Sequence, residues 1–368
     1  MSLLDADRSS PAGTPTRRRR RSSRGEDLSF LFFGLWALAG LCLDGWAHRH
    51  QPELETFFTP WHAVFYSGFL GGVACLAWIV MGGRAQAESL WAAVPDGYQL
   101  AVAGLAVFAV GGIGDGIWHT VFGVETDIDA LLSPTHLIML IGMLGSITAP
   151  LRAAGRDDAM PVTPTLSQFL APLLSITVAA TSVAFFFLYA SGLNNWPMTD
   201  TLIVMNDDSQ VRAALGVLST IVTTVILLTP VMVLLQRWVP PAGSFTVLFT
   251  LVGLFMAGLD AFENWWQVLP AVAGGMVADG LIGSVFRRSD TQVTNDRVTG
   301  AARQAALWCG TVVPIAVWGV STILIHRFWE LRWPPELWAG AIVMATLSGL
   351  ALALITHPAR PARLERHR

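Results

Sequence analysis

The chain has 368 residues, of which 53% are hydrophobic and 13% charged, and its mean hydropathy of +0.53 is too high for an ordinary soluble domain. The net charge of −3 decides little by itself, but the sequence has no Gly-rich phosphate loop, no haem-attachment motif and no nucleic-acid-binding module. These features argue against a soluble nucleotide enzyme and against a nucleic-acid partner, and they predict an integral membrane protein.

Residues 1–27 are rich in Arg, Ser, Pro and Gly and include five consecutive arginines at 17–21. So little apolar surface predicts a disordered Arg-rich cytoplasmic arm whose charge fixes the orientation of the first span. A contact with anionic lipid or nucleic acid is an alternative, and a cleaved signal peptide is another.

Ten apolar runs follow, each near the about 20 residues that a helix needs to cross a bilayer. The predicted fold class is therefore all-α, a polytopic transmembrane helical bundle of about ten spans. Arginines fall after even-numbered runs, with Arg327 and Arg332 as exceptions, so the positive-inside rule places both termini in the cytoplasm of a bacterial-type plasma membrane. They include Arg84, Arg152, Arg156, Arg237, Arg287 and Arg288. The runs cover 28–47, 60–81, 98–119, 134–151, 167–190, 211–236, 243–262, 267–286, 301–326 and 336–356.

Two stretches at predicted outer helix ends repeat one pattern: an Asp-Gly, a His four residues after the Asp, and then Thr/Ser-Pro-x-His. The Asp and first His share a helix face in its last turn, because residues four apart are neighbours on a helix. The hydroxyl and Pro are typical of the start of the next helix, so its first turn carries the second His. Each hairpin thus gathers one trio, Asp44, His48 and His62 or Asp115, His119 and His136.

Two imidazoles and one carboxylate form a ligand set that suits zinc, copper, nickel or, with open positions, iron(II). The matching trios predict an internally duplicated hairpin within residues 28–151, followed by about six further spans in 152–356 and a basic cytoplasmic tail at 357–368. Two mononuclear sites and one binuclear centre are both compatible with the pattern. A duplicated salt-bridged pair without metal is the structural alternative.

Five other acidic residues are candidates for a polar path or for outer hydrogen-bond partners of the ligands. Glu55 and Glu125 occupy comparable places in the two outer loops, where they predict a solvated rim or an acidic mouth. Residues 260–264 resemble a degenerate third copy of the pattern. It begins with Asp260, has Asn264 where the other two copies have His, and adds Glu263. Asp279 lies in the middle of an apolar run, which predicts a hydrogen-bonded or proton-relay role.

The order Asp-x-x-x-His, then Thr/Ser-Pro-x-His, resembles the motif in the C subunit of particulate methane monooxygenase and ammonia monooxygenase. There the three side chains form a copper site within transmembrane helices. The resemblance covers the two hairpins, with the motif duplicated here, and it implies Asp44, His48 and His62, and separately Asp115, His119 and His136, as ligands. It implies copper as the first choice of cofactor, before iron or zinc.

Three functions follow from these patterns. The first is an oxidative, monooxygenase-like metalloenzyme or its membrane subunit, with an apolar, Trp-lined cavity for a small neutral substrate. The second is a metal transporter or chaperone that works with a metal donor. The third is a structural or assembly protein without metal that pairs with other membrane subunits in the lipid bilayer. Ionisable groups concentrate at the predicted outer ends, which favours a fixed metal site.

Overall fold

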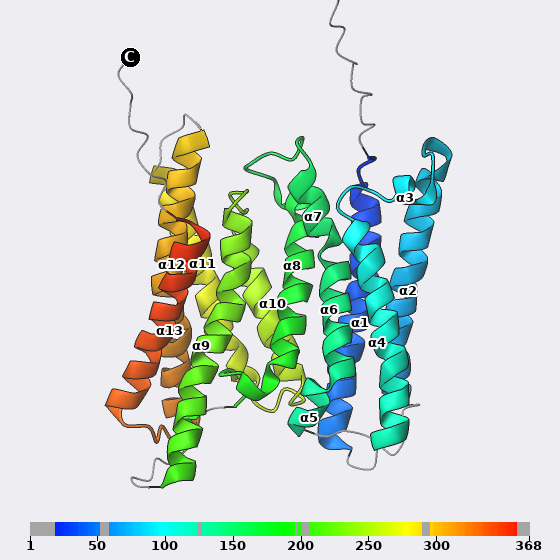
Figure 1. Cartoon of the computed structure of the whole chain (residues 1–368). Coiled ribbons are helices and arrows are strands. Elements are labelled where there is room, and N and C mark those ends of the chain that lie inside the picture. Colours follow the sequence, from blue (N-terminus) through cyan, green and yellow to red (C-terminus); the bar gives the residue numbers. More distant parts are fainter. Residues whose placement is uncertain are drawn as a thin grey trace, which may run out of the picture.

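A computed structural model describes residues 19–51, 59–123, 127–195, 197–200, 206–288 and 295–358. Within these ranges the chain is helical and forms no strand, so the predicted all-α bundle is confirmed (Figure 1). The main helices are α1 (Arg24–His50), α2 (Pro60–Gly83), α4 (Gln99–Phe122), α6 (Pro134–Ile147), α7 (Ala149–Arg156), α8 (Leu166–Phe186), α9 (Asp207–Leu235), α10 (Ser244–Gly258), α11 (Val268–Arg288), α12 (Asn295–Phe328) and α13 (Pro335–Thr356). Shorter elements are α3 (Leu90–Ala93), α5 (Asp127–Leu132), η1 (Arg84–Gln86), η2 (Leu188–Ala190), η3 (Pro197–Thr199) and η4 (Trp265–Gln267).

Nine helical segments among the described residues are long and apolar enough to cross a bilayer, with α6 and α7 together forming one of them. The tenth predicted run is the shorter helix α10, which has 15 residues. The chain is therefore a multi-pass membrane protein whose outer helix faces contact lipid. Helix α1 begins and α13 ends at the same end of the bundle, as an even number of crossings requires (Figure 1).

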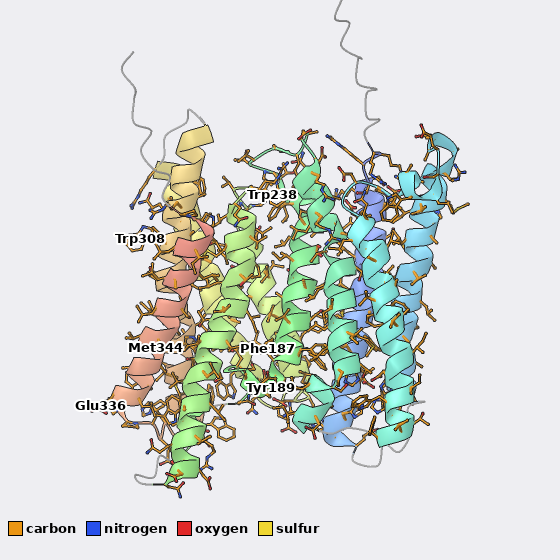
Figure 2. The ribbon with its side chains drawn as sticks, in the orientation of Figure 1. Phe187, Tyr189, Trp238, Trp308, Glu336 and Met344 are labelled. Carbon is orange, nitrogen blue, oxygen red and sulfur yellow. The ribbon has the colours of Figure 1, made fainter. Side chains whose placement is uncertain are left out.

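The helices form two groups joined by α8 and α10 (Figure 1). In the first group α1 packs against α2, and α4 packs against α6. In the second group α9, α11, α12 and α13 pack together. Helix α8 contacts α1, α6 and α10, so it lies between the groups. Figure 2 shows Phe187 and Tyr189, which follow α8, toward one end of the bundle and Trp238 toward the other.

Glycines set the same close crossing in both hairpins of the first group. A Cβ added at Gly68 in α2 would lie 2.5 Å from the backbone nitrogen of Ala37 in α1. A Cβ added at Gly142 in α6 would lie 2.4 Å from the backbone nitrogen of Phe108 in α4. Each glycine lies six residues after the second His of its trio, and each partner lies seven residues before the Asp. The two hairpins share one register, in agreement with the predicted internal duplication.

The first helix starts earlier than the predicted boundary of the N-terminal arm. Ser23 caps α1 by accepting from the backbone nitrogen of Glu26, and the Glu26 carboxylate accepts from the Ser23 backbone nitrogen in return. This reciprocal capping box extends the helix to Arg24, because it satisfies amides that the apolar run alone leaves unpaired. Residues 1–18 of the arm and residues 359–368 of the tail lie outside the described residues.

Candidate metal centre

The ends of the helices in the first group position the two trios. Thr59 and Ser133 cap α2 and α6 by accepting from the backbone nitrogens of His62 and His136, at 3.1 and 3.4 Å. A Pro occupies the first helical turn in both cases, where its missing amide hydrogen costs nothing. The local structure expected from the Thr/Ser-Pro-x-His pattern is therefore present twice, with the second His in the first turn.

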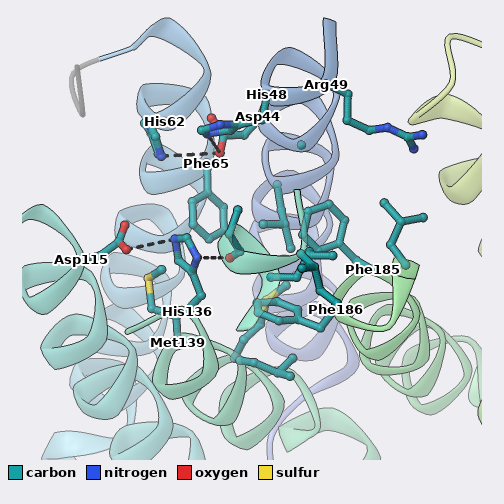
Figure 3. Close-up of a pocket in the computed structure, with 18 of the residues that line it drawn as sticks. Asp44, His48, Arg49, His62, Phe65, Asp115, His136, Met139, Phe185 and Phe186 are labelled. Carbon is teal, nitrogen blue, oxygen red and sulfur yellow. Dashed lines mark hydrogen bonds and ion pairs between the residues drawn. The ribbon is translucent and has the colours of Figure 1, made fainter. Parts of the chain in front are cut away.

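In the first hairpin the two imidazoles face one carboxylate oxygen. The Oδ2 atom of Asp44 lies 3.7 Å from the Nε2 atom of His48 and 3.5 Å from that of His62 (Figure 3). Both separations exceed the range of about 2.7–3.2 Å for a well-formed hydrogen bond. The three groups are thus gathered around a common point without bonding strongly to one another.

The second hairpin repeats this arrangement with a tighter contact. The Oδ1 atom of Asp115 lies 3.6 Å from the Nε2 atom of His119. It lies 3.0 Å from the Nε2 atom of His136, which Figure 3 shows beside Asp115. Asp115 is buried, so this carboxylate is shielded from bulk solvent.

The two trios form one cluster. His62 belongs to the first trio, yet its ring nitrogen lies within 4.8 Å of ligand atoms of both Asp115 and His119. The His62 and His119 ring centroids are 6.3 Å apart. The hairpins therefore face each other at the end of the bundle opposite the start of α1, and the six side chains surround one shared space.

The spacing of these donor atoms fits a transition metal. Ligands at the bond lengths of about 2.0–2.1 Å found for zinc and imidazole lie roughly 3.3 Å apart when they are tetrahedral. The four carboxylate–imidazole distances, from 3.0 to 3.7 Å, bracket that value. Ligand atoms of Asp44, His48 and His62 lie within 4.8 Å of one another, and so do those of His62, Asp115 and His119, so each of these two groups could hold an ion.

Hydrogen bonds on the far side of the rings orient the Nε2 atoms inward. The Nδ1 atom of His119 lies 3.2 Å from the carbonyl oxygen of Gly123, and that of His136 contacts the carbonyl of Ala130. A carbonyl only accepts, so both Nδ1 atoms carry the hydrogen, and in a neutral ring Nε2 then presents its lone pair. The Nδ1 atom of His62 lies 3.0 Å from the Thr59 hydroxyl. Such outer partners are typical of metal-binding histidines.

One carboxylate oxygen of the cluster lacks a hydrogen-bond partner among the described residues. It is the buried Oδ1 atom of Asp44. A buried carboxylate oxygen without a partner carries a large desolvation cost. A cation in the shared space would remove that cost, so the residues present fit a metal.

A cavity of about 300 Å³ adjoins the cluster, and Asp44, His48, His62, Asp115 and His136 form its polar side. Its other side is apolar and includes Phe65, Met139, Met143, Phe185 and Phe186. Figure 3 shows Phe185 and Phe186 facing this space from α8.

The predicted Trp lining of the cavity is wrong. The ring of Trp46 stacks on His50 with centroids 5.1 Å apart and meets the edge of Trp61. Trp118 packs against Phe122 instead. Phenylalanine, leucine and methionine side chains line the cavity in their place, with Tyr66 and Tyr189 the larger polar aromatics.

No protein-family model, curated protein or solved structure matches this chain. The likeness to the monooxygenase C subunits therefore rests on the six motif residues. The chemistry open to this chain follows from its own donor atoms and their surroundings.

Two hydroxyls that hold Asp115 were not among the predicted site residues. The Thr135 hydroxyl donates to Asp115 Oδ1 at 2.9 Å, and the Tyr66 hydroxyl lies 3.5 Å from Asp115 Oδ2. Tyr66 also stacks on His62, with ring centroids 6.3 Å apart. Their positions in the sequence could have indicated these two residues. Tyr66 lies one helical turn after His62, and Thr135 directly precedes His136.

The described acidic candidates Asp260 and Glu263 do not join the cluster. Helix α10 ends at Gly258, and Ala261 and Phe262 adopt left-handed backbone angles, so residues 260–264 do not form a third helix end of the same kind. Asp260 instead pairs with Arg49 of α1 at 2.9 Å, and Glu263 is exposed.

Asp279 of α11 accepts hydrogen bonds from the first amides of α10. Its carboxylate accepts from the backbone nitrogens of Phe245 and Thr246, at 3.2 and 2.9 Å, and from the Thr246 hydroxyl at 2.7 Å. It therefore acts as a side-chain cap on another helix, with its negative charge at the positive end of that helix. Glu55 and Glu125 lie outside the described residues.

Proposed function

We propose that this protein is a membrane metalloprotein that binds a transition metal in the Asp/His cluster, with copper as the first choice. The observation that carries the proposal is the convergence of six donor side chains from two hairpins, with carboxylate–imidazole distances of 3.0 to 3.7 Å. The unpartnered Oδ1 atom of Asp44 supports it, because a bound cation would compensate this buried charge.

The donor set narrows the metal to a class. Imidazole nitrogens suit copper, zinc and iron(II), whereas magnesium and calcium prefer oxygen-rich sites. Copper is preferred over iron and zinc because of the resemblance of the motif to the monooxygenase C subunits. A bound copper or iron would supply redox chemistry, and any of the three would act as a Lewis acid.

The apolar side of the cavity supports an oxidative role on a small neutral substrate. A cavity of about 300 Å³ matches the lower end of ordinary ligand pockets. Phe65, Phe185 and Phe186 would hold an apolar molecule against the cluster while excluding water. We propose a monooxygenase-like protein, or a membrane subunit of such an enzyme, that works with partner subunits.

Transport is less well supported than a fixed site. A transport route needs a continuous polar path, but two of the five acidic candidates for such a path are held elsewhere. Asp260 pairs with Arg49, and Asp279 caps α10. The ionisable groups of the cluster thus stay at one end of the described bundle.

The proposed orientation places the termini in the cytoplasm of a bacterial-type plasma membrane and the cluster toward the outer face. Arg84, Arg152 and Arg156 follow spans that run toward the end where α1 begins. Arg237, Arg287 and Arg288 do the same in the second half of the chain. This clustering of arginine on one side supports the assignment.

The test of metal binding is metal content per chain, measured by mass spectrometry on detergent-purified protein from cells supplied with copper, iron and zinc. Wild type is compared with His48→Ala/His62→Ala and with His119→Ala/His136→Ala. The matched control is His50→Ala/His326→Ala, which removes two exposed imidazoles outside the cluster. We expect stoichiometric copper in wild type and control and a loss in both cluster variants. Metal-free wild type with intact helicity would refute the proposal and leave a structural or assembly role.

A further inference from the structure

The two halves of the cluster are related by duplication but differ at two neighbouring positions. The Asp44 half consists of Asp44, His48 and His62, and the Asp115 half consists of Asp115, His119 and His136. Before the second His, the Asp44 half has Trp61 where the Asp115 half has Thr135. Four residues after it, the Asp44 half has Tyr66 where the other has Leu140.

Both differences favour the same carboxylate. Thr135, from the same hairpin, donates to one oxygen of Asp115, and Tyr66, from the opposite hairpin, approaches the other. Trp61 offers no hydroxyl to Asp44, whose Oδ1 has no hydrogen-bond partner among the described residues. The side chain of Asp115 is therefore oriented by two hydroxyls before any metal binds, whereas that of Asp44 has the longer contacts with His48 and His62, at 3.7 and 3.5 Å.

Solvent access differs in the same direction at the aspartate and the first histidine, and in the opposite direction at the second histidine, where His62 is 8% and His136 18% exposed. The side chain of His48 is 19% exposed, and that of its counterpart His119 is 3% exposed. The Asp44 and Asp115 side chains are 12% and 1% exposed. A chelator or water molecule reaches Asp44 and His48 more readily than Asp115 and His119, so a metal bond to either of the first two is replaced by solvent sooner.

His62 borders both halves but can serve one ion at a time, because a neutral imidazole has only one ring nitrogen with a free lone pair. Asp115 has two imidazoles of its own, with Nε2 atoms at 3.6 and 3.0 Å. Asp44 has His48 as its first imidazole neighbour and depends on His62 for the second. This assignment gives each half one carboxylate and two imidazoles.

We propose that the cluster holds two metal ions of unequal lability, a slowly exchanging one in the Asp115 half and an exchangeable one in the Asp44 half. This inference rests on the proposed metal function and adds the number of ions and their order of release. Loss of one outer hydrogen-bond partner typically weakens metal binding about 10- to 100-fold. A difference of that size between the two halves is expected.

The experiment uses the full chain in detergent micelles, loaded with Cu(II) and then challenged with excess EDTA. Copper per chain is measured against time by mass spectrometry after rapid desalting. We expect two copper ions per chain, released in two phases of equal amplitude whose rates differ by about 10- to 100-fold. Asp44→Ala should remove the fast phase and Asp115→Ala the slow phase.

Thr135→Val is the sharper variant, because it keeps the shape of the side chain and removes the hydroxyl that bonds to Asp115 and also contacts the Ser133 hydroxyl at 3.0 Å. It should accelerate the slow phase and leave the fast phase unchanged. Thr181→Val is its matched control, since the Thr181 hydroxyl is also buried but bonds to the Thr177 carbonyl within α8. The control should change neither phase.

The outcomes separate the two proposals. A single copper ion per chain, or two ions released at one rate, would overturn the inference of unequal halves while metal binding stands. A slow phase unaffected by Thr135→Val would equally overturn it. Wild-type protein that retains no copper before the chelator is added would overturn the metal function and this inference together.

Discussion

Gly142→Ala tests the close crossing that places the Asp115 half. The added Cβ would lie 2.4 Å from the Phe108 backbone nitrogen and 2.6 Å from the Gly104 carbonyl oxygen. Ordinary contact between such atoms is about 3.5 Å, so α4 and α6 must separate by roughly 1 Å. Backbone atoms cannot turn aside as a side chain does, and overpacking of this kind costs about 1–3 kcal/mol.

The matched control is Gly319→Ala in α12, where an added Cβ meets nothing within 4 Å. Replacing glycine by alanine within a helix stabilises it by about 0.5–1 kcal/mol, and this gain is common to both variants. The difference between them therefore isolates the overlap. We expect Gly142→Ala to unfold about 1–3 kcal/mol more easily than Gly319→Ala.

The assay is the free energy of unfolding in mixed micelles as SDS is added, followed by far-ultraviolet circular dichroism. Copper content is measured on the same samples, because separating α4 from α6 moves His136 away from Asp115. Equal unfolding free energies for the two variants would refute the close crossing as described. Full copper retention in a destabilised Gly142→Ala variant would show instead that the cluster tolerates the shift.

Two further predictions use the same unfolding assay. Asp279→Ala should lower the free energy of unfolding by about 1–2 kcal/mol, the usual cost of losing a helix cap. The reason is that the amides of Phe245 and Thr246 lose their acceptor. An unchanged free energy of unfolding would contradict the capping role. Arg49→Gln should change the free energy of unfolding by less than about 1 kcal/mol despite the 2.9 Å contact with Asp260, because the ion pair is partly exposed and screened by solvent. A larger loss would show that this ion pair joins the two groups of helices.

Helix boundaries with a chemical marker could be predicted from the sequence. The run expected to begin at residue 60 does begin there, because Thr59 and Pro60 supply a cap and a fixed backbone angle. The run expected to end at 262 ends at Gly258 instead. Apolar residues continue past that point, so hydropathy does not show where the backbone turns to left-handed angles at Ala261 and Phe262.

The residues of each half of the cluster could be predicted from their spacing in the sequence. The joining of the two halves into one cluster could not. A spacing of four residues fixes Asp44 beside His48 in any helix. The approach of His62 to His119 depends on how two hairpins pack, and the motif contains no information about that. Tyr66 was missed for the same reason, because its contact with Asp115 crosses between hairpins.

The cap that Asp279 places on α10 also bears on how the chain enters the membrane. With 15 residues, α10 is roughly 22 Å long, shorter than the hydrocarbon core of about 30 Å. Its first amides would lack acceptors in lipid, and the acceptor they use belongs to the helix that is synthesised next. We therefore expect α10 to remain at the translocon until α11 has emerged and to insert with it as a hairpin. Glycosylation mapping of chains truncated after α10 or after α11 would test this order, and stable insertion of the shorter chain would contradict it.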